Sequence, residues 1–356
     1  MNFFWVATVA AGLCLTTGVG ARGDDTLTSE PGYVSFRQDS VLRAGCLAGI
    51  RATLNDRFAE AESLFAGLAS EFPESPLGPL FAAGAVQAQM IDTESPARSA
   101  AMSRWLEESS GRTQRLRASG AAPAEAAFFA GIALGYEAIY ESRWGGWFAA
   151  LKQGLRAKNR FREAFREDST LVDALVGIGN YHYWKAARTD FINWLPFIPD
   201  TREQGLAELR RVISEGTVTR EAARASLARA LIHDERYAEA LAHADTLAVA
   251  FPDGKVPLWM QAQANFGLYR WDAAHDLFDE IERRLRRDGP GNYFNLLVCA
   301  YHRAFCDFES GRWGEAIDEC LQAMAYPLSE PVRKRHKKTL SELRDLKRKL
   351  KTMLKG

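Results

Sequence analysis

The feature that most constrains this chain is a helical pattern that recurs along it. In four segments an aromatic residue is followed at offsets of three, seven and ten by small or apolar residues, a spacing that defines one helix face. These segments begin at Phe58, Tyr237, Trp271 and Trp313. Tyr237 and Trp271 lie 34 residues apart. A period of this length predicts stacked helical hairpins, none of which buries its apolar face alone.

Small and helix-ending residues complete the pattern. The residue at the third offset is alanine each time, which lets paired helices approach closely, and a proline ends two of the segments. These positions are Ala61, Pro73, Ala240, Pro252, Ala274 and Ala316. Trp271 and Trp313 are 42 residues apart, which indicates that one unit carries an insertion of eight.

The four segments resemble the tetratricopeptide-repeat (TPR) family. The stretch from Phe58 to Pro76 is also similar to exported bacterial TPR proteins of outer-membrane assembly. The resemblance implies an all-α, TPR-like α-α superhelix, or solenoid. We expect about seven helical pairs in residues 33–329 and a basic capping helix in residues 330–356.

The amino-terminal segment has the composition of an export signal. Residues 1–21 contain no charged side chain, and their apolar stretch is short for a membrane span. Val19-Gly20-Ala21 is a pattern that a signal peptidase prefers. We therefore predict a signal peptide over 1–21, a flexible linker over 22–32, and an exported protein in the periplasm or envelope. Retention of the segment as an anchor is the alternative.

Four cysteines remain once Cys14 leaves with the signal: Cys46, Cys299, Cys306 and Cys320. We expect them to be small buried residues. Cys306 and Cys320 fall on adjacent predicted helices, so a disulfide between these two stays open.

The repeat breaks down over residues 171–206. A glycine-marked helix is followed by an apolar loop at about 185–200, where Pro196 and Pro199 prevent a helix. The order of a glycine-marked helix, Leu-Pro, an acidic cap and Arg-Glu-x-Gly-Leu resembles the TPR proteins of the inclusion-body clearance family. This resemblance covers roughly a tenth of the chain, implies a divergent solenoid with an inserted loop, and transfers no function.

Aromatic residues concentrate around this break. They are Trp144, Trp147, Tyr181, Tyr183, Trp184, Trp194 and Phe197. Exposed aromatic side chains are favoured anchors for a ligand or partner, so these residues are the candidate binding site. The other interpretation, which we favour, is that the loop packs its aromatic side chains against the solenoid.

The sequence contains no motif that indicates catalysis. None of the six histidines belongs to an HExxH pair, and no phosphate loop or nucleophile elbow occurs. Gly177-Ile178-Gly179 lies in a helical pattern without a preceding strand, unlike a dinucleotide-binding turn. We predict a protein that is not an enzyme and has no catalytic, cofactor or metal site.

Charge is balanced overall but concentrated at the carboxyl terminus. The chain has 45 Lys and Arg and 45 Asp and Glu, so no nucleic-acid partner is expected. From Arg333 to Gly356 eleven basic residues face two acidic ones. We interpret this segment as a cap with a solvated basic face, and contact with a membrane surface or an acidic partner as its second role.

Two functions follow from these observations. The first is a non-catalytic scaffold of the cell envelope that binds segments of partner proteins in a concave groove lined by the first helix of each pair. The alternative is a small-molecule binding accessory component of a solute uptake system, which uses the aromatic region 144–197 as its pocket.

Overall fold

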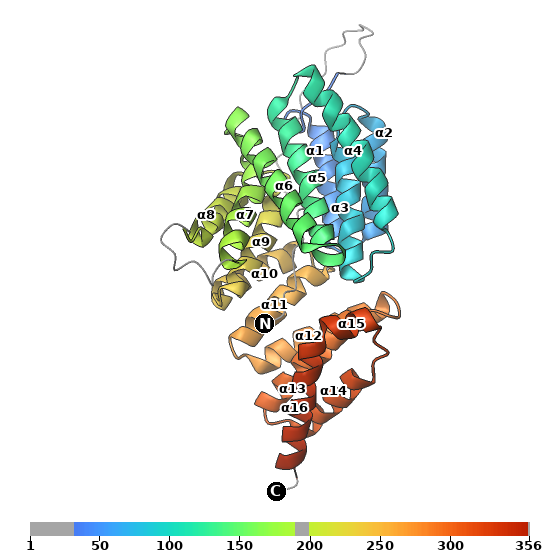
Figure 1. The fold of residues 1–356 in the computed structure, drawn as a ribbon, viewed down its shortest axis with the longest axis vertical. Helices are drawn as coiled ribbons and strands as arrows, with labels where there is room; N and C mark the ends of the chain where they lie inside the picture. Colours follow the sequence, from blue (N-terminus) through green and yellow to red (C-terminus); the bar gives the residue numbers. More distant parts are fainter. Residues whose placement is uncertain (1–31, 189–198, 355–356) are drawn as a thin grey trace. The chain divides into compact units, whose positions relative to one another are not determined.

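The computed structural model describes residues 32–188 and 199–354, and every regular element in these ranges is helical. The all-α prediction is confirmed. Helices that follow one another in the chain pack together, as in a TPR-like array (Figure 1). The predicted signal peptide, residues 22–31 of the predicted linker, and the candidate residues Trp194 and Phe197 lie outside the described residues.

Sixteen α-helices and one short 3-10 helix are described. Their bounds are α1 Ser40–Leu54, α2 Phe58–Glu71, α3 Leu77–Asp92, α4 Ser99–Ser119, α5 Pro123–Trp144, α6 Trp147–Glu167, η1 Val172–Ala174, α7 Leu175–Arg188, α8 Arg202–Glu215, α9 Arg220–His233, α10 Tyr237–Ala250, α11 Lys255–Gly267, α12 Trp271–Arg287, α13 Tyr293–Glu309, α14 Trp313–Ala325, α15 Glu330–Arg335 and α16 Lys337–Met353. In chain order, α1 to α14 form the seven expected pairs.

The chain divides into two compact units, with the boundary inside α9 between Leu227 and Ala228. We call the described residues up to Leu227 the N-terminal unit and those from Ala228 onward the C-terminal unit. Each unit is described by itself.

The predicted repeat positions lie where a helical hairpin requires them. The helices α2, α10, α12 and α14 each begin at the aromatic residue of the pattern. The pattern alanines Ala61, Ala240, Ala274 and Ala316 are all fully buried. Because an alanine occupies so little volume, the second helix of each pair packs closely on its neighbours.

The turn before each of these helices has one backbone geometry. Two residues before the aromatic, Asp56, Glu235 and Tyr269 have φ of 60°, 60° and 59°, and Gly311 has φ of 76°. The next residue donates its N–H to the carbonyl five positions earlier, at 2.8–2.9 Å in all four turns. This is the hydrogen bond of a Schellman motif. The repeat is therefore present in the backbone as well as in the side chains.

The α7–α8 pair of the N-terminal unit meets backbone to backbone. A Cβ atom placed on Gly205 would lie 2.6 Å from the carbonyl oxygen of Gly179 and 2.7 Å from the amide nitrogen of Tyr183. Only glycine permits this approach. The glycines that mark this region in the sequence thus allow the two helices to pack closely.

Asp173 holds the link between α8 and α9. Its buried carboxylate accepts hydrogen bonds from the backbone N–H groups of Thr217 and Thr219, at 3.0–3.1 and 2.7 Å, and from both threonine hydroxyls at 2.9 and 2.7 Å. These bonds satisfy donors at the start of α9 that would otherwise have no helical partner. A side chain from η1 thus fixes a link that lacks the proline of the regular repeats.

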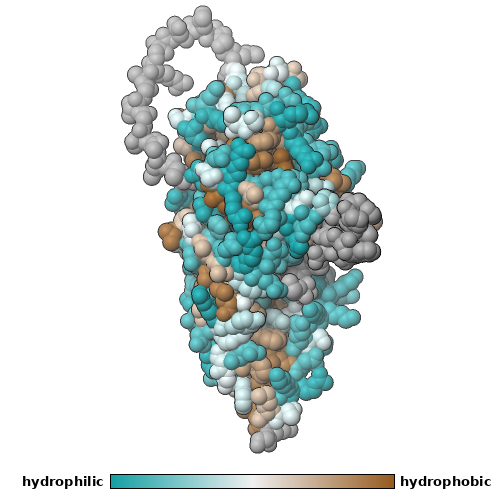
Figure 2. Space-filling model, turned by 90° about the vertical axis from the view of Figure 1, so that its left-hand side faces the viewer, coloured by the Kyte–Doolittle hydropathy of each residue, from teal (hydrophilic) through white to brown (hydrophobic). Residues whose placement is uncertain are grey.

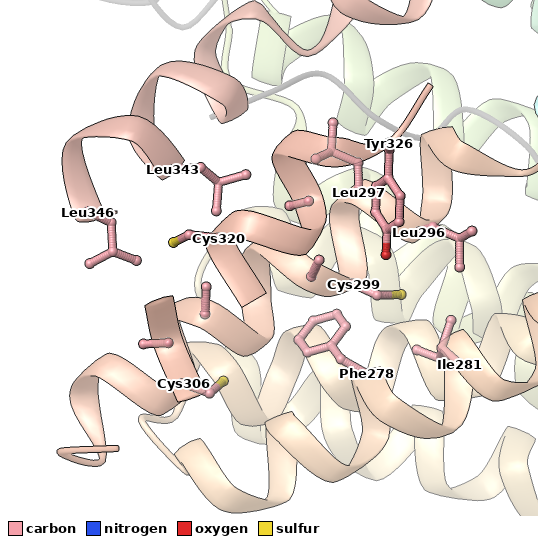
Figure 3. Packing of buried hydrophobic residues seen from close by; sticks show 14 of the residues in the cluster. Phe278, Ile281, Leu296, Leu297, Cys299, Cys306, Cys320, Tyr326, Leu343 and Leu346 are labelled. Atoms are coloured by element: carbon pink, nitrogen blue, oxygen red, sulfur yellow. The ribbon is translucent and has the colours of Figure 1, made fainter. Parts of the chain in front are cut away.

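The C-terminal unit has a continuous apolar core between α11 and α16. Figure 3 shows Leu343 and Leu346 of α16 pointing toward Cys320 of α14. The leucine stripe of the last helix therefore covers the final hairpin, as a capping helix should. All four described cysteines are free and buried, and burial raises the pKa of the Cys320 thiol to about 11 and that of Cys306 to about 12. The favoured prediction for the cysteines is confirmed.

The basic C-terminal segment forms two helices instead of one. The capping helix expected over residues 330–356 is interrupted at His336, which has φ of −97° and ψ of 17°. The imidazole of His336 is buried, with its ring centroid 4.2 Å from that of Phe294. The interruption lets this ring pack on α13 while the leucines of α16 stay on the core.

Candidate partner-binding surface on α6 and α7

The five described aromatic residues predicted as a binding site make separate contacts. Tyr183 is fully buried at the α7–α8 contact, and the ring of Trp184 meets it edge-on at a centroid distance of 5.0 Å. Trp144 packs against Tyr140 of its own helix, with centroids 5.5 Å apart. These side chains contact neighbouring rings within the described helices, whereas the interpretation that the loop packs its aromatic side chains against the solenoid concerns residues that lie mostly outside the described ranges.

Trp147 and Tyr181 reach the surface beside cations of a neighbouring helix, whereas the cation beside Trp144 is Arg143 of its own helix. Trp147 opens α6 and is 53% exposed, with the Arg188 guanidinium 5.1 Å from its ring centroid. Tyr181 is half-buried on α7, and the Lys158 ammonium lies 4.6 Å from its ring. Each pair has the geometry of a cation–π contact between α6 and α7.

His182 joins three helices through its two ring nitrogens. Its Nδ1 lies 2.7 Å from a carboxylate oxygen of Glu208 on α8, and its Nε2 lies 3.2 Å from the Arg162 guanidinium of α6. Arginine only donates hydrogen bonds, so Nε2 accepts and the Nδ1–H donates to Glu208. The histidine is thus a bridge between Glu208 and Arg162 that orients the Arg162 guanidinium.

Positive charge accumulates where α6 faces α7. Burial lowers the pKa of the Lys158 ammonium first, and the charges of Arg162 and Lys185 lower it further. Three cations therefore repel one another beside the exposed part of Tyr181. An anionic group docked here would relieve that repulsion, so the surface is suited to a carboxylate-bearing segment.

Sequence reasoning identified Tyr181 but missed Lys158, Arg162 and the Glu208 partner of His182. These side chains come from three helices, and no spacing within one helix predicts their meeting. A signal was present, since α6 contains only cations among its charged residues from Trp147 to Arg162.

On the face drawn in Figure 2, hydrophobic residues reach the surface as separate patches among hydrophilic ones.

A second polar site closes the amino-terminal end of the described chain. A cavity of about 320 Å³ lies between residues 33–38, the start of α5 and the end of α6. The buried Glu125 carboxylate accepts the hydroxyl protons of Tyr33 and Ser35, and Arg37 bridges Glu125 and Asp168. Hydrogen bonds from Thr170, then from Arg37, lower the pKa of Asp168 to about 2. This network fastens the first segment to the α5–α6 pair.

The described residues contain no group of three or more His, Cys, Asp or Glu side chains arranged to hold a metal ion. Among the helices described, none combines the length and hydropathy needed to cross a membrane.

No family model matches the chain, and no curated protein does. Among solved structures, the C-terminal part of a TPR repeat-containing protein from Cytophaga hutchinsonii is 14% identical, with a TM-score of 0.43, over 81% of this chain and 98% of that one. A TPR protein from Parabacteroides merdae is 12% identical, with a TM-score of 0.36, over 87% and 99%.

The likeness is distant and concerns the fold. Helix order and the four matching turns of this chain define the TPR-like class by themselves. The narrower similarities to outer-membrane assembly and inclusion-body clearance proteins stay predictions.

Proposed function

We propose that this protein is a non-catalytic scaffold of the cell envelope that binds a carboxylate-bearing segment of a partner protein. The observation that carries the proposal is the group of Lys158, Arg162 and Lys185 beside Tyr181. α7 is the first helix of its pair, the kind of helix expected to line the groove of such an array. A partner with acidic and apolar side chains would meet both the cations and the ring.

The geometry favours a partner surface over a solute pocket. Tyr183 is in the core, Trp144 packs on Tyr140, and Tyr181 lies under Lys158, so these rings serve separate contacts. A pocket for a small molecule would need several rings to converge on one cavity. The exposed basic face of α16 is a second candidate contact for an acidic partner or a membrane surface.

A photo-crosslinking experiment tests the proposal. A benzophenone amino acid would replace Tyr181 in the full chain, and in a matched control it would replace the exposed Val249 of α10. We expect a discrete crosslinked protein from the Tyr181 position only. Lys158→Glu should reduce that product about tenfold, because it reverses a charge at the contact, whereas Arg166→Glu farther along α6 should not.

Two results would contradict the proposal. One is the same set of products from both crosslinker positions, since it would indicate nonspecific collision. The other is a Tyr181 product that Lys158→Glu leaves unchanged. The location is tested separately by fusing residues 1–32 to a reporter that is active only after export, and a reporter that stays inactive would refute the envelope assignment.

A further inference from the structure

Helix α6 carries two apolar faces, and only one of them is used in the fold. Ala150, Ala157, Phe161 and Ala164 are buried against the N-terminal unit. A different set reaches solvent at the start of the helix: Trp147 is 53% exposed, Phe148 83%, Leu151 44% and Leu155 37%. A helix on the surface of a soluble protein normally presents polar residues on its outer side.

The exposed set is continuous along the helix. Phe148, Leu151 and Leu155 are spaced by three and four residues, so their side chains follow one another on one face. At about 100° of rotation per residue, that face points away from the stripe of Ala150, Ala157 and Phe161. Trp147 adds a ring at the helix start. A continuous row of large apolar side chains in water marks an interaction site.

Cations border this apolar face. Lys152 and Arg156 are exposed next to it along the helix. From Trp147 to Arg162 the helix has five Lys and Arg and no Asp or Glu. The partner for such a face must be apolar in the middle and negatively charged around it.

The nearest acidic side chains of α5 do not neutralise these cations by direct pairing. The Glu137 carboxylate accepts a hydrogen bond from the Gln153 amide at 2.5 Å and is attracted by the charge of Arg156 without a direct ion pair. Glu141 accepts a hydrogen bond from the backbone N–H of Gly146 at 3.1 Å, and Glu163, one turn beyond the basic stretch, pairs with Arg160 and Arg117. The charge of Arg156 is therefore partly offset at a distance, and the start of α6 stays positive overall.

We propose that α6 docks on an anionic lipid bilayer, with its axis in the plane of the surface. Phe148, Leu151 and Leu155 enter the boundary between headgroups and acyl chains. Lys152 and Arg156 contact lipid phosphates, and Trp147 takes the interfacial position that its amphipathic ring favours. This assignment is independent of the protein partner proposed for Tyr181.

Two other occupants fit the face less well. A second copy of the chain would bring Lys152 and Arg156 against the same two cations, and like charges across an interface are unfavourable. A protein partner of ordinary affinity buries about 20–30 residues on each side, whereas this face offers four apolar side chains on one helix. A bilayer requires neither a groove nor a large contact.

Vesicle binding by the full chain tests the proposal. Sedimentation would compare phosphatidylcholine vesicles with vesicles that contain a quarter phosphatidylglycerol. We expect binding at least about tenfold tighter to the anionic vesicles, because each cation near the surface adds to the attraction. Phe148→Ser combined with Leu151→Ser should weaken that binding at least about tenfold.

The chain supplies a matched control for the apolar substitutions. Val249→Ser removes a side chain that is 85% exposed on α10 and should leave binding unchanged. Every variant keeps the same residues 1–31, so any membrane affinity of that segment is common to all. A double variant that binds as tightly as the parent would overturn the proposal.

Fluorescence locates the contact on the molecule. Brominated lipids quench tryptophans that reach the acyl boundary, so quenching should fall markedly in Trp147→Phe although eight other tryptophans remain.

Vesicle binding by the variant Lys334→Glu with Lys338→Glu tests the basic tail as the alternative contact. If this tail variant loses vesicle binding while the Phe148→Ser, Leu151→Ser variant binds as tightly as the parent, the contact belongs to α15 and α16 instead. A crosslinker at Phe148 that captures a protein, with no vesicle binding, would also refute the bilayer.

Discussion

The C-terminal unit and the α5–α8 segment of the N-terminal unit build helical hairpins by different means. In the C-terminal unit, the turns before α10, α12 and α14 share one backbone geometry, and the large side chains around them enter the core. In the α5–α8 segment, α5 and α6 are long helices of 22 and 21 residues. The next pair, α7 and α8, meets at glycines, and Asp173 holds the link that follows α8.

The difference shows how a recurring turn affects which side chains are used in the fold. A recurring turn leaves few apolar or charged side chains without a position in the stack. Where the turn is lost, the fold is held by individual side chains, and others are left for partners. The exposed apolar face of α6 and the cations beside Tyr181 both occur in this irregular segment.

The largest expected effect comes from the glycine contact that only the irregular segment uses. Gly205→Val would place a branched side chain against the Gly179 carbonyl, and the backbones must separate. We expect the free energy of unfolding to fall by about 3 kcal/mol, at the upper end for overpacked sites. Chemical denaturation measures this change. Gly314→Ala in α14, where a Cβ meets no atom within 4 Å, should raise stability by about 0.5–1 kcal/mol.

The link before α9 gives the next effect. Asp173→Ala removes the acceptor for two backbone N–H groups and two hydroxyls, of which those of Thr219 are fully buried. A loss of about 2–3 kcal/mol is expected from these charge-assisted hydrogen bonds. Pro252→Ala, at the corresponding link of a regular repeat, should cost under about 1 kcal/mol, since it mainly changes the entropy of the unfolded chain. Equal losses in the two variants would show that the links are equivalent.

Acid should affect the C-terminal unit through two histidines, the buried His336 and the half-buried His302. Burial lowers the pKa of His302 and of His336 to about 4, in the second case with help from the charge of Arg335. The unfolded chain takes up each proton near pH 6.5, so stability is full above that pH and falls until about pH 4. Between pH 7 and pH 5 we expect a loss of about 2 kcal/mol for each histidine, measured by urea titration at each pH.

A pair of variants isolates this contribution. His302→Gln and His336→Gln keep polar groups but cannot titrate, so the double variant should lose most of the stability change over this interval. If the pH dependence of the double variant equalled that of the parent, these two histidines would not be its source.

The regular part of the fold could be predicted because its signal lies in the order of residues along one helix. The aromatic at Trp271 and the alanine at Ala274 mark the start of α12 and its buried face without knowledge of any other helix. The turn geometry was less predictable. Glu235 and Tyr269 have left-handed backbones, which these residue types disfavour, whereas Asp56 and Gly311 are of types that adopt this geometry more readily.

The candidate site was harder to predict, since it depends on contacts between helices. Tyr183 and Tyr181 are two residues apart on α7, yet one is buried against α8 and the other lies under Lys158 of α6. Aromatic composition could not separate them, because helix rotation decides which ring faces the neighbour. The exposure of Phe148 could not be predicted from the sequence either, because its helix already has a complete buried stripe.

The smallest effect tests whether the four regular turns are equivalent. Glu235→Gly should stabilise the protein by about 0.5–1 kcal/mol, because glycine adopts φ of 60° without the steric cost that a side chain brings. Gly311→Ala, at the same position of the turn before α14, should destabilise it by about 1 kcal/mol. Denaturation midpoints of the two variants measure both signs. If Glu235→Gly lowers stability instead, the glutamate side chain supports its turn, and that repeat is held by a specific contact in the way that Asp173 holds the link before α9.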